Sequence, residues 1–171
     1  TTIYSSDDWK NSPVVNSYSM FKNCTKLKGA VAFNDNETDA SMANPTTGYF
    51  TAKTYVEYKD NTLTFYCDTK RASRPGTSYS IHDRNLDLNY PAWAGDVSDV
   101  NERITKVVFD GSFKNYKPTS TERWFSYCTK IKTIEGIENL ITDEVTDMSR
   151  MFSGCSALTS INMSNFNTEK V

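Results

Sequence analysis

One eight-residue motif occurs three times in this chain, and this repetition constrains the fold more than any other feature. The pattern x-F-x-x-C-[S/T]-x-[L/I] appears as MFKNCTKL from Met20, as WFSYCTKI from Trp124 and as MFSGCSAL from Met151. The last two copies begin at residues 124 and 151, a separation of 27 residues. Periods of this length are typical of repeat proteins, in which neighbouring copies stack and share one core.

The two halves of the repeat predict different local structures. In VTDMSRMFSGC, the apolar residues Val145, Met148, Met151 and Phe152 follow a helical spacing, and Gly154 can end a short helix in the left-handed conformation. In the following SINMSNF, Ile161 and Met163 alternate as they would on a β-strand. The sequence therefore predicts an α/β repeat solenoid whose coils each contain a parallel strand and a short helix.

The string VTDMSRMFSGCSALTSINMSNFNTEKV, residues 145–171, resembles a repeat of the BspA-like leucine-rich-repeat proteins of bacterial surfaces. The copy at Trp124 departs from the pattern, with Thr121 in the slot of Met148 and Tyr127 in the slot of Gly154. The resemblance implies leucine-rich-repeat coils in a secreted or surface-anchored bacterial protein. It also implies adhesion or binding to host or bacterial partners, and it carries over no catalytic residue.

A stretch without the repeat divides the chain. YVEYKDNTLTFYCD predicts an antiparallel β-hairpin, from Tyr55–Tyr58 to Leu63–Cys67, and we interpret residues 54–103 as a cap or insertion. Residues 1–53 are then the terminal coil and tail of a preceding array, and residues 104–171 the repeats proper. One continuous solenoid with a long looped insertion is the alternative. Both interpretations make the chain a monomeric fragment of a longer array.

The recurring cysteine has several possible roles. Cys24, Cys128 and Cys155 occupy the same slot of the motif but lie far apart, whereas zinc sites use closely paired ligands. A small buried side chain is the favoured interpretation, and a disulfide between Cys128 and Cys155 stays open. Cys67 is expected to be a further buried thiol. No cofactor is predicted.

Two other sites receive weaker support from the sequence. Asp35, Glu37 and Asp39 alternate within NDNETD and could offer oxygen ligands to calcium, although a solvated acidic loop is favoured because the spacing of an EF-hand is absent. The pair His82-Asp83 is the single sequence feature that suggests catalysis, and no reaction-specific motif accompanies it. We therefore expect a protein without catalytic activity.

Charge and hydropathy narrow the class of partner. Lys plus Arg is 19 and Asp plus Glu is 21, so no basic excess points to nucleic acid. No apolar run reaches the ~18 residues of a membrane span. We expect an extracellular, surface-exposed module that binds a protein, with glycan binding by cap aromatics and a purely structural spacer as alternatives. The candidate binding residues are Thr159, Ser160 and Asn162 on the last predicted strand, and Tyr55, Tyr58, Tyr90 and Trp93 in the interruption.

Overall fold

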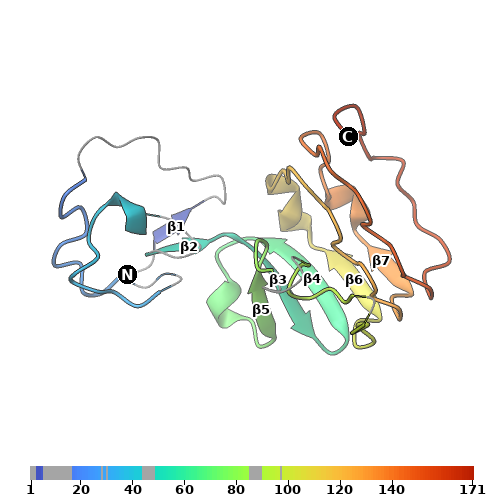
Figure 1. The fold of residues 1–171 in the computed structure, drawn as a ribbon, viewed down its shortest axis with the longest axis horizontal. Coiled ribbons are helices and arrows are strands. Elements are labelled where there is room, and N and C mark those ends of the chain that lie inside the picture. Colours follow the sequence, from blue (N-terminus) through green and yellow to red (C-terminus); the bar gives the residue numbers. More distant parts are fainter. Residues whose placement is uncertain are drawn as a thin grey trace. The chain divides into compact units, whose positions relative to one another are not determined.

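The computed structural model describes residues 3–5, 17–27, 29, 31–43, 49–84, 90–96 and 98–171 of the chain. The chain divides into two compact units, Thr1–Lys53 and Thr54–Val171. Each unit has a hydrophobic core of its own. The two units are described separately below (Figure 1).

The first unit is small and contains little regular structure. Strand β1 (Ile3–Ser5) pairs in parallel with β2 (Phe50–Ala52), and the 3-10 helix η1 (Ala40–Met42) lies between them in sequence. The rings of Phe21 and Tyr49 meet edge to face, with centroids 5.5 Å apart. Met42, Ala43 and Phe50 complete this core among the described residues.

The second unit is built on a mixed five-stranded sheet in the order β5-β3-β4-β6-β7. Strand β3 (Thr54–Lys59) lies between β4 (Thr62–Cys67) and β5 (Thr77–Ser80) and pairs with both in antiparallel fashion. Strands β6 (Lys106–Phe109) and β7 (Thr133–Glu135) then add to β4 in parallel. Figure 1 shows this sheet running from β5 to β7.

The hairpin expected between Tyr55 and Cys67 is present as β3 and β4, joined by a tight two-residue turn. Asp60 and Asn61 occupy the turn with φ values of 49° and 59°. Two consecutive left-handed residues match the right-handed twist of the flanking strands, and Asp and Asn adopt this conformation more readily than most residues.

One face of the sheet carries the core. Val56 lies opposite Phe65, and Phe65 lies opposite Phe109, so that one row of apolar side chains crosses three strands. The ring of Phe65 stacks on Trp124, with centroids 5.2 Å apart, and meets Trp93 edge to face at 5.7 Å. These rings form an aromatic layer in the core of the second unit.

The predicted α/β leucine-rich-repeat solenoid is wrong. The described residues form no α-helix, and their helical segments are 3-10 turns: η1, η2 (Arg71–Ser73), η3 (Gly111–Asn115) and η4 (Ile137–Asn139). Residues 158–163, where a strand was expected, form none. A mixed sheet and long hydrogen-bonded turns take the place of stacked strand-and-helix coils.

Consecutive four-residue turns stand where the helix was predicted. Residues 17–24, 121–128 and 148–155, here called the first, second and third turn segments, share one hydrogen-bonding scheme. In the second, the N–H groups of Trp124, Ser126 and Cys128 donate to carbonyls three residues earlier, at 3.2, 3.1 and 3.1 Å. The third segment repeats these bonds from Met151, Ser153 and Cys155, and the first repeats them from Met20, Lys22 and Cys24.

Left-handed residues explain why no helix forms. Arg123 and Tyr127 have φ values of 56° and 52°, and the matching Arg150 and Gly154 have 56° and 75°. A left-handed residue at every fourth position interrupts the bonds from each N–H to the fourth preceding carbonyl. The four-residue spacing also places apolar residues at intervals of three and four, which over so short a stretch resembles a helical period.

The N–H groups that the turns leave free join the second segment to the third. Thr121, Arg123, Phe125 and Tyr127 donate to the carbonyls of residues 147, 149, 151 and 153, at 2.9, 3.0, 2.9 and 2.7 Å. Phe125 and Phe152 stack with their centroids 5.5 Å apart. Equivalent positions of the sequence repeat are therefore held side by side by an alternating backbone ladder.

The predicted boundary near residue 103 falls between elements that share this sheet. Strand β4 belongs to the predicted cap and pairs directly with β6 of the predicted repeats, with Leu63 opposite Val107. In the predicted terminal coil, residues 6–16 and 44–48 lie outside the described residues. The division into 1–53, 54–103 and 104–171 stays a prediction.

Candidate functional site

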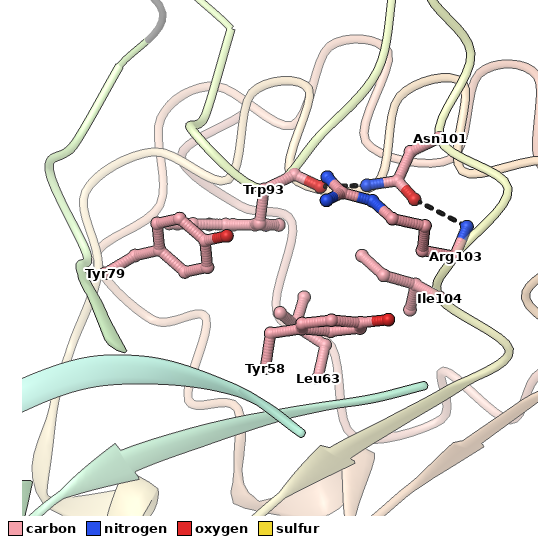
Figure 2. A pocket seen from close by; sticks show the side chains of 7 residues that line it. All are labelled: Tyr58, Leu63, Tyr79, Trp93, Asn101, Arg103 and Ile104. Atoms are coloured by element: carbon pink, nitrogen blue, oxygen red, sulfur yellow. Dashed lines mark hydrogen bonds between the residues drawn. The ribbon is translucent and has the colours of Figure 1, made fainter. Parts of the chain in front are cut away.

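The second unit carries a narrow aromatic crevice at one end of its core, shown in Figure 2. Strands β3, β4 and β5 contribute Tyr58, Leu63 and Tyr79, and the segment before β6 contributes the remaining residues. The seven lining residues are Tyr58, Leu63, Tyr79, Trp93, Asn101, Arg103 and Ile104.

A chain of hydrogen bonds fixes the inner wall of the crevice. The indole N–H of Trp93 donates to the carbonyl of Trp124 at 2.8 Å. The side-chain amide of Asn101 donates to the carbonyl of Trp93 at 2.8 Å, and its oxygen accepts the N–H of Arg103 at 2.9 Å. Because Trp93 and Asn101 are both buried, these bonds hold the wall in one arrangement (Figure 2).

The outer rim of the crevice presents aromatic rings and one cation. Tyr58 and Tyr79 are half-buried and Arg103 is exposed. The Arg103 guanidinium lies 5.8 Å from the centroid of the Tyr58 ring, within the range of a cation–π interaction. Side chains fill the crevice so completely that no space for a water-sized sphere is left. A partner would therefore contact the rim, since nothing fits inside.

Of the four aromatic residues proposed from the sequence, the structure brings Tyr58 and Trp93 together in this crevice. Tyr55 lies on the opposite face of the sheet and is fully buried. Tyr90 is half-buried elsewhere, with the Arg123 guanidinium 4.9 Å from its ring centroid. Trp93 is itself only 1 % exposed, so it supports the rim and does not present a ring to solvent.

Tyr55 belongs to a polar cluster on the other face. Its hydroxyl donates to Asp68 at 2.6 Å and accepts from Arg74 at 2.6 Å, and the Arg74 guanidinium lies 3.4 Å above the Tyr66 ring. Burial and the neighbouring Asp68 carboxylate raise the pKa of Tyr55. Burial opposes ionisation of Asp68, yet hydrogen bonds from Tyr55, Arg74 and the N–H of Lys70 lower its pKa. The cluster is internally satisfied and fixes the chain after β4.

The predicted strand-face residues are exposed but do not lie on a strand. Thr159, Ser160 and Asn162 follow the third turn segment in irregular backbone. The Asn162 side chain accepts the N–H of Ser164 at 3.0 Å and so stabilises a local turn.

The His82-Asp83 pair also has a local structural partner. Asp83 accepts the backbone N–H of Ser80 at 2.6 Å, at the end of β5, while His82 is exposed. The Asp83 carboxylate therefore stabilises the turn that follows β5.

The acidic loop at 34–39 is organised by a tyrosine. The Tyr49 hydroxyl accepts the N–H of Asn34 at 2.9 Å and lies 2.7 Å from the carbonyl of Glu37, to which it can donate. Across the described residues, no group of three or more His, Cys, Asp or Glu side chains is placed to hold a metal ion. Asp35, Glu37 and Asp39 all belong to the described part of the chain.

All four cysteines are free thiols. Cys128 is fully buried in the core, and burial, together with the nearby Cys155, raises its pKa to about 12. Burial raises the pKa of Cys155 to about 11, and its Sγ donates to the carbonyl of Phe125 at 3.0 Å. A raised pKa keeps the thiols protonated and makes them poor nucleophiles.

Tyr79, Asn101 and Arg103 are crevice residues that the sequence reasoning missed. Tyr79 stands opposite Val56 on β5, so an alternating pattern in TSYS and the register of the hairpin could have placed it beside the core. Nothing in the local sequence marks Arg103, because its position depends on the loop that leads into β6.

Comparison with known proteins gives one match. A family model described as "Mycoplasma protein of unknown function, DUF285" matches residues 97–171, less than half of the chain. No curated protein and no solved structure matches the chain. The family description indicates a bacterial protein. Within the described residues, no helix has the length and apolar character required to cross a bilayer.

Proposed function

We propose that this chain is a non-catalytic binding module of a bacterial surface protein, and that the rim of the aromatic crevice contacts a protein partner. The observation that carries the proposal is the grouping of Tyr58, Tyr79 and Arg103 on a rigid, buried wall. Tyr, Trp and Arg are the residue types that most often dominate binding energy in protein interfaces.

Three features support this choice. The wall is held by buried hydrogen bonds, so little side-chain freedom would be lost there on binding. The crevice is filled, which favours a partner that covers the rim over a small molecule that enters it. The resemblance of residues 145–171 to BspA-like surface proteins supports a location outside the cell.

The test compares adhesion of beads coated with the full chain or with Arg103→Ala to mucus-coated and bacterial surfaces. Loss of a rim contact of this kind should weaken adhesion about tenfold. Lys114→Ala is the matched control, because Lys114 is an exposed cation on η3 and does not line the crevice. Treating the target surface with protease should abolish adhesion. Equal adhesion of the wild type and Arg103→Ala would contradict the proposed site.

Carbohydrate binding is the second candidate, favoured by the half-buried rings of Tyr58 and Tyr79 at the rim. Sugar rings stack on exposed aromatic faces, but the Arg103 guanidinium already lies over the Tyr58 ring. A glycan array separates the candidates: binding that disappears in Tyr79→Ala supports the carbohydrate version, and a blank array eliminates it.

A further inference from the structure

The third turn segment presents an unpaired backbone edge. In the second turn segment, the N–H groups of Thr121, Arg123, Phe125 and Tyr127 all donate to the third. The matching N–H groups of the third segment belong to Met148, Arg150, Phe152 and Gly154. Among the described residues these four N–H groups have no hydrogen-bond acceptor.

The side chains along this edge show the same difference. Phe125 and Ile131 are 0 % exposed. Their counterparts Phe152 and Leu158 are only partly buried. The same apolar positions are thus covered in one copy of the repeat and open in the next.

The first turn segment offers the complementary row. The carbonyls of residues 149, 151 and 153 accept the ladder from the second segment, and the equivalent carbonyls in the first segment are those of Tyr18, Met20 and Lys22. The carbonyls of Met20 and Lys22 accept no hydrogen bond in the described structure. Met20 is 52 % exposed, whereas its counterpart Met151, which faces the second segment, is 4 % exposed.

We infer that the third turn segment binds a second copy of this chain, through the first turn segment of that copy. The register follows from the ladder within one molecule: Phe152 N–H donates to the Met20 carbonyl of the second copy, and Gly154 N–H to its Lys22 carbonyl. The pairing repeats the bonds from Phe125 to Met151 and from Tyr127 to Ser153. The contact is head to tail, so each added molecule leaves a free donor row for another.

The donor pattern excludes the symmetric alternative. If two third turn segments met face to face, N–H groups would oppose N–H groups and none would find an acceptor. A two-fold dimer through this edge therefore gains no backbone hydrogen bonds. The N–H row requires a partner edge that presents free backbone carbonyls.

Sedimentation of the full chain over a range of concentrations tests the inference. The wild type should associate progressively, and Met20→Asp should weaken association at least tenfold, because docking buries this position beside the ladder. Tyr18→Ser is the matched control: its counterpart Ser149 stays exposed beside the second segment, so association should be unchanged.

Amide hydrogen exchange on the same samples provides the second readout. The amides of Phe152 and Gly154 should exchange fast in dilute wild type and slow down at least tenfold as the concentration rises. In Met20→Asp they should stay fast at every concentration. A wild type that stays monomeric up to about 1 mM, or that associates without slowing these two amides, would overturn the inference.

Discussion

Cys128 and Cys155 occupy the same slot of the repeat and have different surroundings. The structure offers Cys155 an acceptor, the carbonyl of Phe125 at 3.0 Å. Cys128 is fully buried: the backbone N–H of Gly95 faces its sulfur as a donor, and the described residues offer its S–H no acceptor. A serine hydroxyl would therefore find a hydrogen-bond acceptor at position 155 but not at position 128, although the two sequences around the cysteines are similar.

We predict that Cys128→Ser lowers the free energy of unfolding by about 1–3 kcal/mol, because the described core offers the buried O–H no acceptor. Cys155→Ser should cost less than about 1 kcal/mol, since the hydroxyl can donate to Phe125. Urea unfolding monitored by circular dichroism measures both. Cys24→Ser, at an exposed thiol, is the control and should be neutral. Equal losses for Cys128→Ser and Cys155→Ser would contradict the role of the Phe125 carbonyl.

At the scale of elements, the sequence predicted strands better than it predicted the repeat. The hairpin was predictable because alternation, β-branched residues and Asp-Asn at the turn all agree. The turn segments were not, because a four-residue spacing of left-handed residues imitates a helical period over two turns. Arg123 and Tyr127 are left-handed although neither is glycine, and residue type alone does not predict this conformation for such residues.

The candidate site was predicted only in part, for a related reason. Tyr58 and Trp93 could be proposed as exposed aromatics from composition, but their meeting depends on the pairing of β4 with β6. That pairing joins residues more than forty positions apart, such as Leu63 and Val107. Long-range register of this kind is set by the packing of the whole core, and no local pattern specifies it.

Gly136 carries a prediction about the link between β7 and η4. Its φ is 67°, and a Cβ there would lie 2.2 Å from the backbone carbonyl of Phe109. In Gly136→Ala, the alanine would have to adopt a strained left-handed conformation, and its Cβ would clash with the backbone. The substitution should destabilise the second unit by about 2–4 kcal/mol. Gly111→Ala is the matched control, because no atom lies within 4 Å of its Cβ position. Thermal unfolding compares the two, and a shift for Gly111→Ala as large as that for Gly136→Ala would contradict this explanation.

The described residues of the chain form two hydrophobic cores that share no residue. The core of Thr1–Lys53 is small and centres on Tyr49, whose ring packs against Phe21 and whose hydroxyl binds the backbone of Asn34. The core of Thr54–Val171 is larger and centres on Phe65. Cores of such different size are expected to differ in stability.

Because the cores are separate, a substitution in one should leave the other intact. Tyr49→Phe removes the hydroxyl that the Asn34 N–H requires and should lower the stability of Thr1–Lys53 by about 1–3 kcal/mol. Leu63→Ala should lower that of Thr54–Val171 by about 2–5 kcal/mol through loss of buried surface and a cavity. Hydrogen exchange in urea, followed on peptides from each unit, reports both stabilities in one sample. If either substitution lowered both stabilities equally, the chain would unfold as one cooperative unit, and the separation of the cores would have no energetic meaning.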